Sequence, residues 1–319
     1  MRIRKYHPHK SVLFVTFSVE EGLFLLANPL CKAIVQSCLG AAQALYPVTI
    51  SHFVIQSTHV HLLMTVYNPD DVKDFIRHFK TETAHLFNNL LGRAKRTIWC
   101  EGYDSPIVLC PEKAMSIIAY IYANPVKDNL IGSIDLFPGL SSWKMFLKGE
   151  HTKKWKRIRR DAVRALPHHS LKTYTQESER LLSESKIIHE FSIHPNAWLE
   201  AFGITDPEMQ KAKNQEIVER VRSLEQSAAA ERQRPVRGRE ALLSEVIDLS
   251  YRPQRSGKRT CCLSEDKDLR IRFIEFLKAL YAQAAKVADR WRLGDFSLPF
   301  PPGCYPPSFP KLAEPLAAW

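Results

Sequence analysis

Runs of β-branched and aromatic residues predict four strands in the first part of the chain. The run over 12–19 is rich in Val and Phe and ends at a pair of glutamates, as a strand does before a turn. Segments 48–56 and 59–66 predict two further strands, and the short connection between them favours a hairpin. A shorter apolar run over 106–110 predicts a fourth strand.

Apolar residues spaced three and four apart predict helices between and after these strands. One helix is expected over 30–45 and a second over 69–92, where Asn68 is a typical N-cap before a first-turn proline. A third helix is expected over 111–124. It should break at Pro125, because proline lacks the N–H that a helix interior needs.

The predicted order is therefore strand, helix, strand, strand, helix, strand, followed by one more helix. This order is typical of a ferredoxin-like fold. The sequence thus predicts an α+β protein with an antiparallel sheet that carries helices on one face. The other face of the sheet is expected to stay free for chemistry.

The pattern changes after residue 150, and the chain divides into three predicted regions. Residues 1–150 form the ferredoxin-like domain, 151–172 form a basic segment, and 173–319 form a mainly helical accessory region. No catalytic signature is visible in the last region. We expect it to serve DNA recognition or self-association.

The accessory region contains helical and extended patterns of its own. Charged and amphipathic helices are expected over 217–232 and 266–292, and residues 234–239 have the composition of a linker. Seven prolines over 299–315 predict an extended, Pro-rich tail. No internal repeat is visible.

The charge of the chain indicates an anionic partner. The 319 residues carry a net charge of +11, and residues 151–172 alone carry eight Lys and Arg against one Asp. Nucleic acid is the expected partner, with phosphates on the cations and a base stacked on the tryptophan. The predicted DNA-binding residues are Lys153, Lys154, Trp155, Lys156, Arg157, Arg159 and Arg160. The alternative is a solvated charge run that joins two domains.

Cysteine usage and hydropathy indicate a cytoplasmic protein that does not enter a membrane. The seven cysteines are odd in number and form no C-x-x-C pair, which fits a reducing cytosol. The basic N-terminal segment is followed by an apolar run that two glutamates interrupt, so no signal peptide is expected. Proline and polar residues interrupt the uncharged segment 33–69, which is expected to form buried core.

Two histidines are candidates for a metal site. His59 and His61 share one face of their predicted strand, because side chains alternate along a strand. Two neighbouring imidazoles can bind a divalent ion that polarises a phosphate oxygen. The alternative is two polar residues on a half-exposed strand. A second pair, His7 and His9, lies in the Pro-broken N-terminal segment and is set aside.

Tyr120 and Asn124 form the second candidate pair. Helical spacing places Met115, Ile118, Ala119, Ile121 and Tyr122 on the apolar side of their helix and Tyr120 with Asn124 on the opposite side. A tyrosine beside a metal-polarised phosphate can act as a nucleophile that forms a covalent phosphotyrosine. The alternative is a surface tyrosine.

Three motifs together resemble the HUH-class single-tyrosine transposases, including the REP-associated tyrosine transposases. They are His59-Val-His61-Leu-Leu-Met, Trp99-Cys-Glu-Gly-Tyr-Asp104 and Tyr120-Ile-Tyr-Ala-Asn124-Pro-Val-Lys127. The resemblance covers roughly residues 5–148 and implies a ferredoxin-like catalytic domain. It implies His59 and His61 as paired metal ligands, Tyr120 as the nucleophile and Asn124 as the third ligand. Thr58 stands where the family usually has Asn.

The activity that the resemblance implies is DNA transposition. Tyr120 would attack single-stranded DNA that carries imperfect palindromes or hairpins, with Mg²⁺ or Mn²⁺ as cofactor, and leave a 5′-phosphotyrosine and a free 3′-OH. Two alternatives remain: a domesticated protein that binds DNA hairpins without cutting, and an HUH nickase for replication initiation or conjugation. The resemblance leaves open whether the protein acts as a homodimer, and the target DNA sequence is not predicted.

Overall fold

A six-stranded sheet lies at the centre of the computed structural model, which describes residues 5–20, 28–94, 96–166, 170–245 and 260–306. Its strands, in spatial order, are β5 (Leu140–Ser141), β2 (Thr49–Ile55), β3 (His59–Thr65), β1 (Val12–Ser18), β4 (Ile107–Val108) and β8 (Cys262–Leu263). Neighbouring strands are antiparallel except for the pair β4 and β8. The order β2-β3-β1-β4 is that of a ferredoxin-like sheet, and the predicted α+β class is confirmed.

The predicted hairpin joins β2 and β3 and sets which side chains face which side of the sheet. Ile55 pairs with Val60, and the Gln56 amide donates to the His59 carbonyl at 2.9 Å, which closes the turn. The alternate β3 residues Val60, Leu62 and Met64 face one hydrophobic cluster, while Leu63 faces another. His59 and His61 therefore point to the same side as Leu63.

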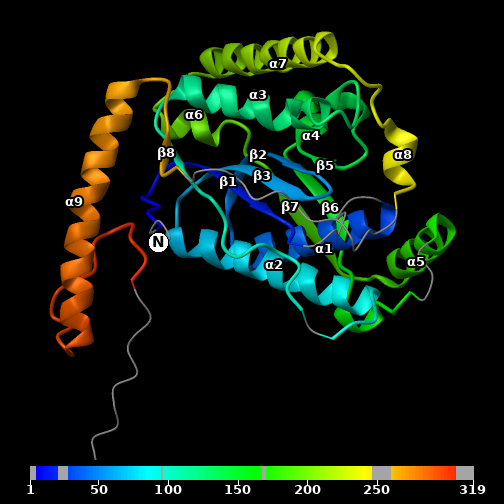
Figure 1. The fold of residues 1–319 in the computed structure, drawn as a ribbon, viewed down its shortest axis with the longest axis horizontal. Helices are drawn as coiled ribbons and strands as arrows, with labels where there is room; N and C mark the ends of the chain where they lie inside the picture. The colour runs from blue at the N-terminus through cyan, green and yellow to red at the C-terminus, as the bar shows by residue number, and fades with distance from the viewer. Residues whose placement is uncertain (1–4, 21–27, 95, 167–169, 246–259, 307–319) are drawn as a thin grey trace, which may run out of the picture.

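Helices α1 (Pro29–Leu45) and α2 (Pro69–Leu90) cover the first face of the sheet (Figure 1). Each begins with an asparagine cap followed by proline: Asn28 accepts from the Cys31 amide at 2.9 Å, and Asn68 accepts from the Asp70 amide at 3.2 Å. Both helices lie where the hydrophobic pattern placed them, and the cap at Asn68 was predicted, whereas the cap at Asn28 was not.

Helix α3 (Pro111–Lys127) covers the second face, which was expected to stay free (Figure 1). That expectation was wrong because the apolar side of α3 packs on this face, where Ile118, Ile121 and Tyr122 are buried with Leu63. The predicted break at Pro125 was also wrong. Proline removes only one N–H in the last turn of the helix, and the Asp128 amide still donates to the Asn124 carbonyl at 2.9 Å.

The chain after residue 127 adds mainly short elements and two long helices. These are 3₁₀ helix η1 (Ile134–Leu136), α4 (Trp143–Lys148), β6 (Thr152–Lys156), 3₁₀ helix η2 (Arg160–Ala162), α5 (Leu171–Glu184), β7 (Ile188–Ser192), α6 (Ala197–Ala201), α7 (Pro207–Ala230), α8 (Arg239–Leu243) and α9 (Lys267–Arg292). The expected helix over 266–292 is α9. The helix expected from 217 begins earlier, at Pro207, where Asp206 caps it.

The later elements pack against the ferredoxin-like core. Strands β6 and β7 form a two-stranded antiparallel sheet beside α1, and α7 lies along α3 (Figure 1). Phe191 belongs to the cluster under α1 and α2, whereas Trp198 and Val221 belong to the cluster under α3. The division at residues 150 and 172 stays a prediction about function. Residues 307–319 of the expected Pro-rich tail lie outside the described residues.

None of the seven cysteines, all of which lie among the described residues, forms a disulfide bond. Within the part of the chain that the structure describes, no helix is both long enough and apolar enough to cross a membrane.

Candidate active site

His59 and His61 lie side by side between β3 and α3. Their ring centroids are 4.7 Å apart, and the two rings are nearly perpendicular at 79°. His61 is 7% exposed and stacks on Phe14 of β1, with centroids 5.6 Å apart and an angle of 12°. The His59 side chain, at the start of the strand, is 26% exposed. One imidazole is thus enclosed and the other reaches solvent.

Tyr120 of α3 contacts His61 of this pair. Its ring lies edge-on to His61, with centroids 5.6 Å apart and an angle of 75°, and also contacts Phe14 at 6.3 Å. The Lys127 ammonium group lies 5.2 Å from the centre of the Tyr120 ring. Helical spacing had placed Tyr120 off the apolar side of its helix, and it is half-buried here.

Asn124 lies one helical turn beyond Tyr120 and is 4% exposed. Its Oδ1 atom is 3.1 Å from His59 Nε2 and also accepts a hydrogen bond from the side-chain amide of Gln56. On the other side of the ring, Thr58 Oγ1 lies 3.0 Å from His59 Nδ1. His59 is therefore held at both nitrogens, and the hydroxyl of Thr58 makes one of these contacts.

His61 differs from His59 because neither of its ring nitrogens has a hydrogen-bond partner among the described residues. Burial and, to a smaller extent, the neighbouring His59 lower the pKa of His61 to about 3. A buried, neutral imidazole with both nitrogens unpaired is costly unless something else binds it. The neutral form is also the one that ligates a metal. These residues therefore fit a divalent ion held by His59, His61 and Asn124.

The donor set is two imidazoles and one amide oxygen. Within the residues that the structure describes, no group of three or more His, Cys, Asp and Glu side chains converges as a metal cluster. Imidazole nitrogen suits Mn²⁺ better than Mg²⁺, which prefers oxygen ligands.

The electrostatics of the site keep the tyrosine protonated at neutral pH. Burial raises the pKa of Tyr120, the nearby Asp128 carboxylate raises it further, and a hydrogen bond with Asn124 opposes both. Burial also raises the pKa of Asp128, although His59 acts against this because its Nε2 lies 4.0 Å from Asp128 Oδ2.

Three residues of the site, Phe14, Gln56 and Asp128, were not among the predicted ones. Asp128 lies four residues after Asn124, so the spacing that linked Tyr120 to Asn124 would have found it, had α3 not been expected to end at Pro125. Gln56 lies opposite His59 at the end of the hairpin, and that pairing was a usable signal. Phe14 is apolar and carried no signal for a site.

The predicted DNA-binding segment lies on the other side of the sheet. Strand β6 packs beside α1, whereas the imidazoles face α3, so the structure does not bring the two groups together. Trp155 stacks on Phe191, with ring centroids 4.3 Å apart and an angle of 14°. Its role as a base-stacking residue stays a prediction.

The cations of this segment differ in their exposure and in their hydrogen-bond and ion-pair partners. Lys154, Lys156 and Arg157 are exposed, and the Lys156 ammonium donates to the Leu182 carbonyl at 2.6 Å. Arg159 pairs with Asp161, and Arg160 pairs with Glu82 of α2. These two arginines would have to exchange a carboxylate for a phosphate in order to bind DNA.

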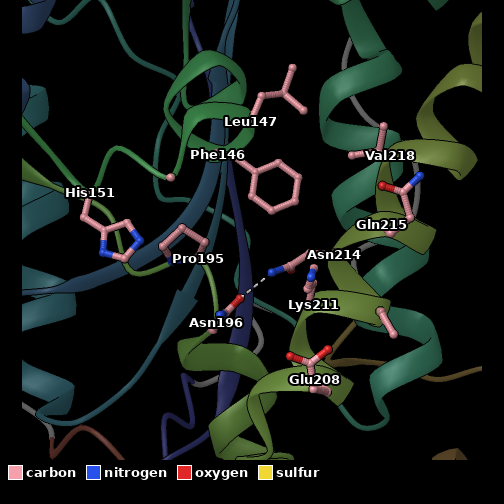
Figure 2. A pocket seen from close by; sticks show the side chains of 12 residues that line it. Phe146, Leu147, His151, Pro195, Asn196, Glu208, Lys211, Asn214, Gln215 and Val218 are labelled. Atoms are coloured by element: carbon pink, nitrogen blue, oxygen red, sulfur yellow. Dashed lines mark hydrogen bonds between the residues drawn. The ribbon is translucent and has the colours of Figure 1, made fainter.

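A further pocket lies between α4, α6 and α7 and contains none of the predicted site residues (Figure 2). It is lined by amides, by Glu208 and by Lys211, and the Asn214 amide donates to Asn196 Oδ1 at 2.9 Å. With one cation and one carboxylate among its lining residues, this pocket has no preference for charge.

Comparison with known families finds one match. Residues 24–124 match the family model described as "Transposase IS200 like". The matched stretch contains His59, His61, Tyr120 and Asn124 and ends before the basic segment. The resemblance that the three motifs indicated is thereby confirmed for this part of the chain.

The chain is also similar to a solved structure of a REP-associated tyrosine transposase bound to a REP hairpin. The identity is 18%, the TM-score is 0.39, and the similarity covers 46% of this chain and 86% of the other. A comparison with curated proteins found no match.

Proposed function

We propose that this protein is a DNA transposase that cleaves and rejoins single-stranded DNA through a covalent bond to Tyr120. One observation carries the proposal: the Tyr120 ring contacts His61, whose nitrogens have no hydrogen-bond partner among the described residues, and Asn124, on the next turn of the same helix as Tyr120, contacts His59. The match of residues 24–124 to IS200-like transposases supports the same assignment.

His59, His61 and Asn124 would hold the divalent ion. When bound there, Mn²⁺ or Mg²⁺ would polarise an oxygen of the scissile phosphate and stabilise the charge that develops during transfer. Gln56 positions the Asn124 oxygen, and Thr58 fixes the His59 ring, so each of these two ligands is oriented by a neighbour.

Tyr120 supplies the nucleophile. Its phenol loses a proton, the phenolic oxygen bonds to phosphorus, and the bond from phosphorus to the 3′-oxygen of the upstream nucleotide breaks. The departing 3′-oxygen takes a proton from solvent, which gives a free 3′-OH and a 5′-phosphotyrosine. Attack by another 3′-OH reverses these steps and joins a new strand, so the bond energy is conserved.

Because its pKa is raised, Tyr120 must be deprotonated during the reaction. The phenol must lose its proton at the moment of attack, since burial and Asp128 disfavour the phenolate in the resting protein. Lys127, above the Tyr120 ring, is the cation of α3 placed to offset part of that penalty.

The experiment that tests the proposal is formation of a covalent protein–DNA adduct. The protein is incubated with single-stranded hairpin DNA and Mn²⁺, and the adduct is resolved on a denaturing gel. Tyr120→Phe should abolish the adduct, because the nucleophilic oxygen is lost. Tyr67→Phe is the matched control, since Tyr67 is 45% exposed and lies at the other end of β3.

Each other outcome has a defined meaning. An adduct that persists in Tyr120→Phe would contradict the assignment of the nucleophile. Hairpin binding by the wild-type protein with no adduct would instead support the domesticated binding protein. Cleavage without rejoining to an added 3′-OH strand would support the nickase.

A further inference from the structure

Another pocket, which shares no residue with the candidate active site, is lined by four cations. It lies between α1, the loop that leads into β5, α4, β6 and α8. Lys32 enters it from α1, Lys144 from α4, Lys153 from β6 and Arg239 from α8. Lys144 and Lys153 lie nine residues apart in the sequence, whereas Lys32 and Arg239 come from distant parts of it. Figure 1 shows α8 at the end of the molecule where β5 and β6 lie.

Only one of the four cations of this pocket, Lys153, forms an ion pair with a described residue. No carboxylate lines the pocket in the described part of the chain, and neither Lys144 nor Arg239 forms an ion pair with a described residue. The nearest carboxylate contact is peripheral: Glu150 Oε2 lies 3.9 Å from the Lys153 ammonium. Lys32 donates to the Pro138 carbonyl at 2.6 Å. Four cations therefore line the pocket, and among the described residues a single carboxylate, that of Glu150, pairs with one of them.

Convergence of like charges without a counter-charge is unfavourable. Burial lowers the pKa of Lys32, and the charges of Arg239, Lys144 and Lys153 lower it further. An anion in the pocket would remove this repulsion and gain charge-assisted hydrogen bonds from ammonium and guanidinium groups. The site is built for an anion with several acceptor oxygens.

We propose that this pocket binds a phosphate group of the DNA substrate, at Lys32, Lys144, Lys153 and Arg239. Phosphate matches both the guanidinium fork of arginine and the point charges of lysine. The inference rests on the proposed function, because it assigns the pocket to the same DNA molecule that Tyr120 would cleave.

Continuity with β6 favours DNA over a free anion. Lys153 lies both in the pocket and in the predicted DNA-binding segment, and Trp155 lines the pocket from the same face of β6. Lys154 and Lys156 are exposed on the other face of this strand and add cations beside the pocket. A DNA strand that follows β6 would thus place one phosphate at the mouth of the pocket.

The inference also gives the accessory region a role. Arg239 belongs to α8, which lies far beyond the segment that matches IS200-like transposases. Helix α8 would complete a DNA contact that the matched segment lacks.

The test is DNA affinity as a function of salt for the full-length double variant Lys144→Gln with Arg239→Gln. Both side chains are exposed, and the variant keeps Lys32 and its bond to the Pro138 carbonyl. The probe is a labelled single-stranded hairpin oligonucleotide, measured by fluorescence anisotropy in EDTA so that no cleavage occurs. Lys211→Gln in the Figure 2 pocket is a control that removes one exposed cation outside the cation pocket.

The expected result is a loss of salt-dependent affinity. Removing two phosphate contacts on a single strand lowers the slope of log K against log salt by about 1.4 and weakens binding roughly tenfold at low salt. Lys211→Gln should leave the slope unchanged and should change the affinity at low salt by no more than about twofold. Equal slopes for the double variant and the wild type would overturn the inference.

A second arm distinguishes DNA from free phosphate. Isothermal titration with inorganic phosphate is carried out on the wild type and the double variant. Phosphate binding that the double variant loses, with its DNA affinity unchanged, would assign the pocket to a free anion and overturn the DNA proposal. Because affinity is measured in EDTA, this test is independent of the adduct, so failure of the proposed function and failure of this inference are separate results.

Discussion

The candidate active site and the cation pocket are opposite kinds of site. In the first, aromatic, amide and carboxyl side chains gather around two imidazoles, and His61 has no hydrogen-bond partner among the described residues. In the second, Lys and Arg side chains gather around an open space without a carboxylate in its described lining. The first arrangement suits a metal ion and a reacting phosphate, and the second suits a phosphate that is only held.

This difference suggests a division of labour between chemistry and affinity. Phosphate contacts by exposed cations dominate the strength of nucleic-acid binding, whereas the groups that react need not contribute to it. The two sites also share no residue, because one lies between β3 and α3 and the other is lined from α1, α4, β6 and α8. Variants of one site should therefore leave the function of the other in place.

The largest expected effect is the loss of chemistry in His59→Ala or His61→Ala. Each removes a ligand of the proposed ion, whose stabilisation of the transition state is worth several kcal/mol, so cleavage should fall by about a thousandfold or more. Hairpin affinity in EDTA should stay within about twofold. His9→Ala is the control, because His9 is an exposed histidine outside the site. Loss of DNA binding in the His59 or His61 variants would break the division of labour.

A smaller effect is expected from Gln56→Ala. Gln56 touches neither imidazole through its side chain but donates to Asn124 Oδ1, so its loss frees the Asn124 amide to rotate. Residues that orient a metal ligand typically affect metal affinity 10–100-fold. The variant should therefore need about tenfold more Mn²⁺ for half-maximal cleavage and recover at saturating Mn²⁺.

Gln215→Ala, in the Figure 2 pocket, is the control for Gln56→Ala. A Gln56 variant with unchanged Mn²⁺ dependence would contradict the role of Gln56 in positioning Asn124. The measurement is the initial cleavage rate across a Mn²⁺ titration.

The smallest effect concerns Glu82, which pairs with Arg160 of the basic segment. The hydrogen bond from Arg160 lowers the pKa of Glu82, so this pair stabilises the fold above pH 4.5 and its contribution is lost as the pH falls further. Glu82→Gln should cost about 0.5 kcal/mol of unfolding free energy at neutral pH, since Arg160 is half exposed, and almost nothing in acid.

Glu82→Gln also tests whether the basic segment binds DNA. It frees Arg160 from its carboxylate, so hairpin affinity at low salt should rise about twofold if the basic segment binds DNA. Urea unfolding at two pH values checks the first expectation, and anisotropy checks the second. Unchanged affinity would indicate that Arg160 serves only to join η2 to α2.

The sequence predicted most of the ferredoxin-like sheet and the two helices under it. These elements have strong local signals, such as the Asn-Pro starts of α1 and α2 and the β-branched runs of β1 and β3. The sequence also predicted which side chains share a face, because alternation and helical spacing are local rules. His59 with His61, and Tyr120 with Asn124, were found in this way.

What the sequence could not predict depends on contacts between distant segments. The placement of α3 over the second face follows from its packing on Leu63, and its continuation through Pro125 follows from the buried contacts that hold its last turn. The cation pocket needs Lys32 and Arg239 to meet across the whole fold. Charge counting found Lys153 but had no means of joining it to these two residues.

The most direct measurement of the central claim is mass spectrometric mapping of the covalent adduct. The protein is trapped on hairpin DNA with Mn²⁺, digested with nuclease and protease, and searched for peptides that carry a nucleotide on tyrosine. The account predicts one modified site, Tyr120, with the phosphate bonded to its phenolic oxygen. A nucleotide on Tyr103 or Tyr122, or none on any tyrosine of a cleavage-active sample, would contradict it.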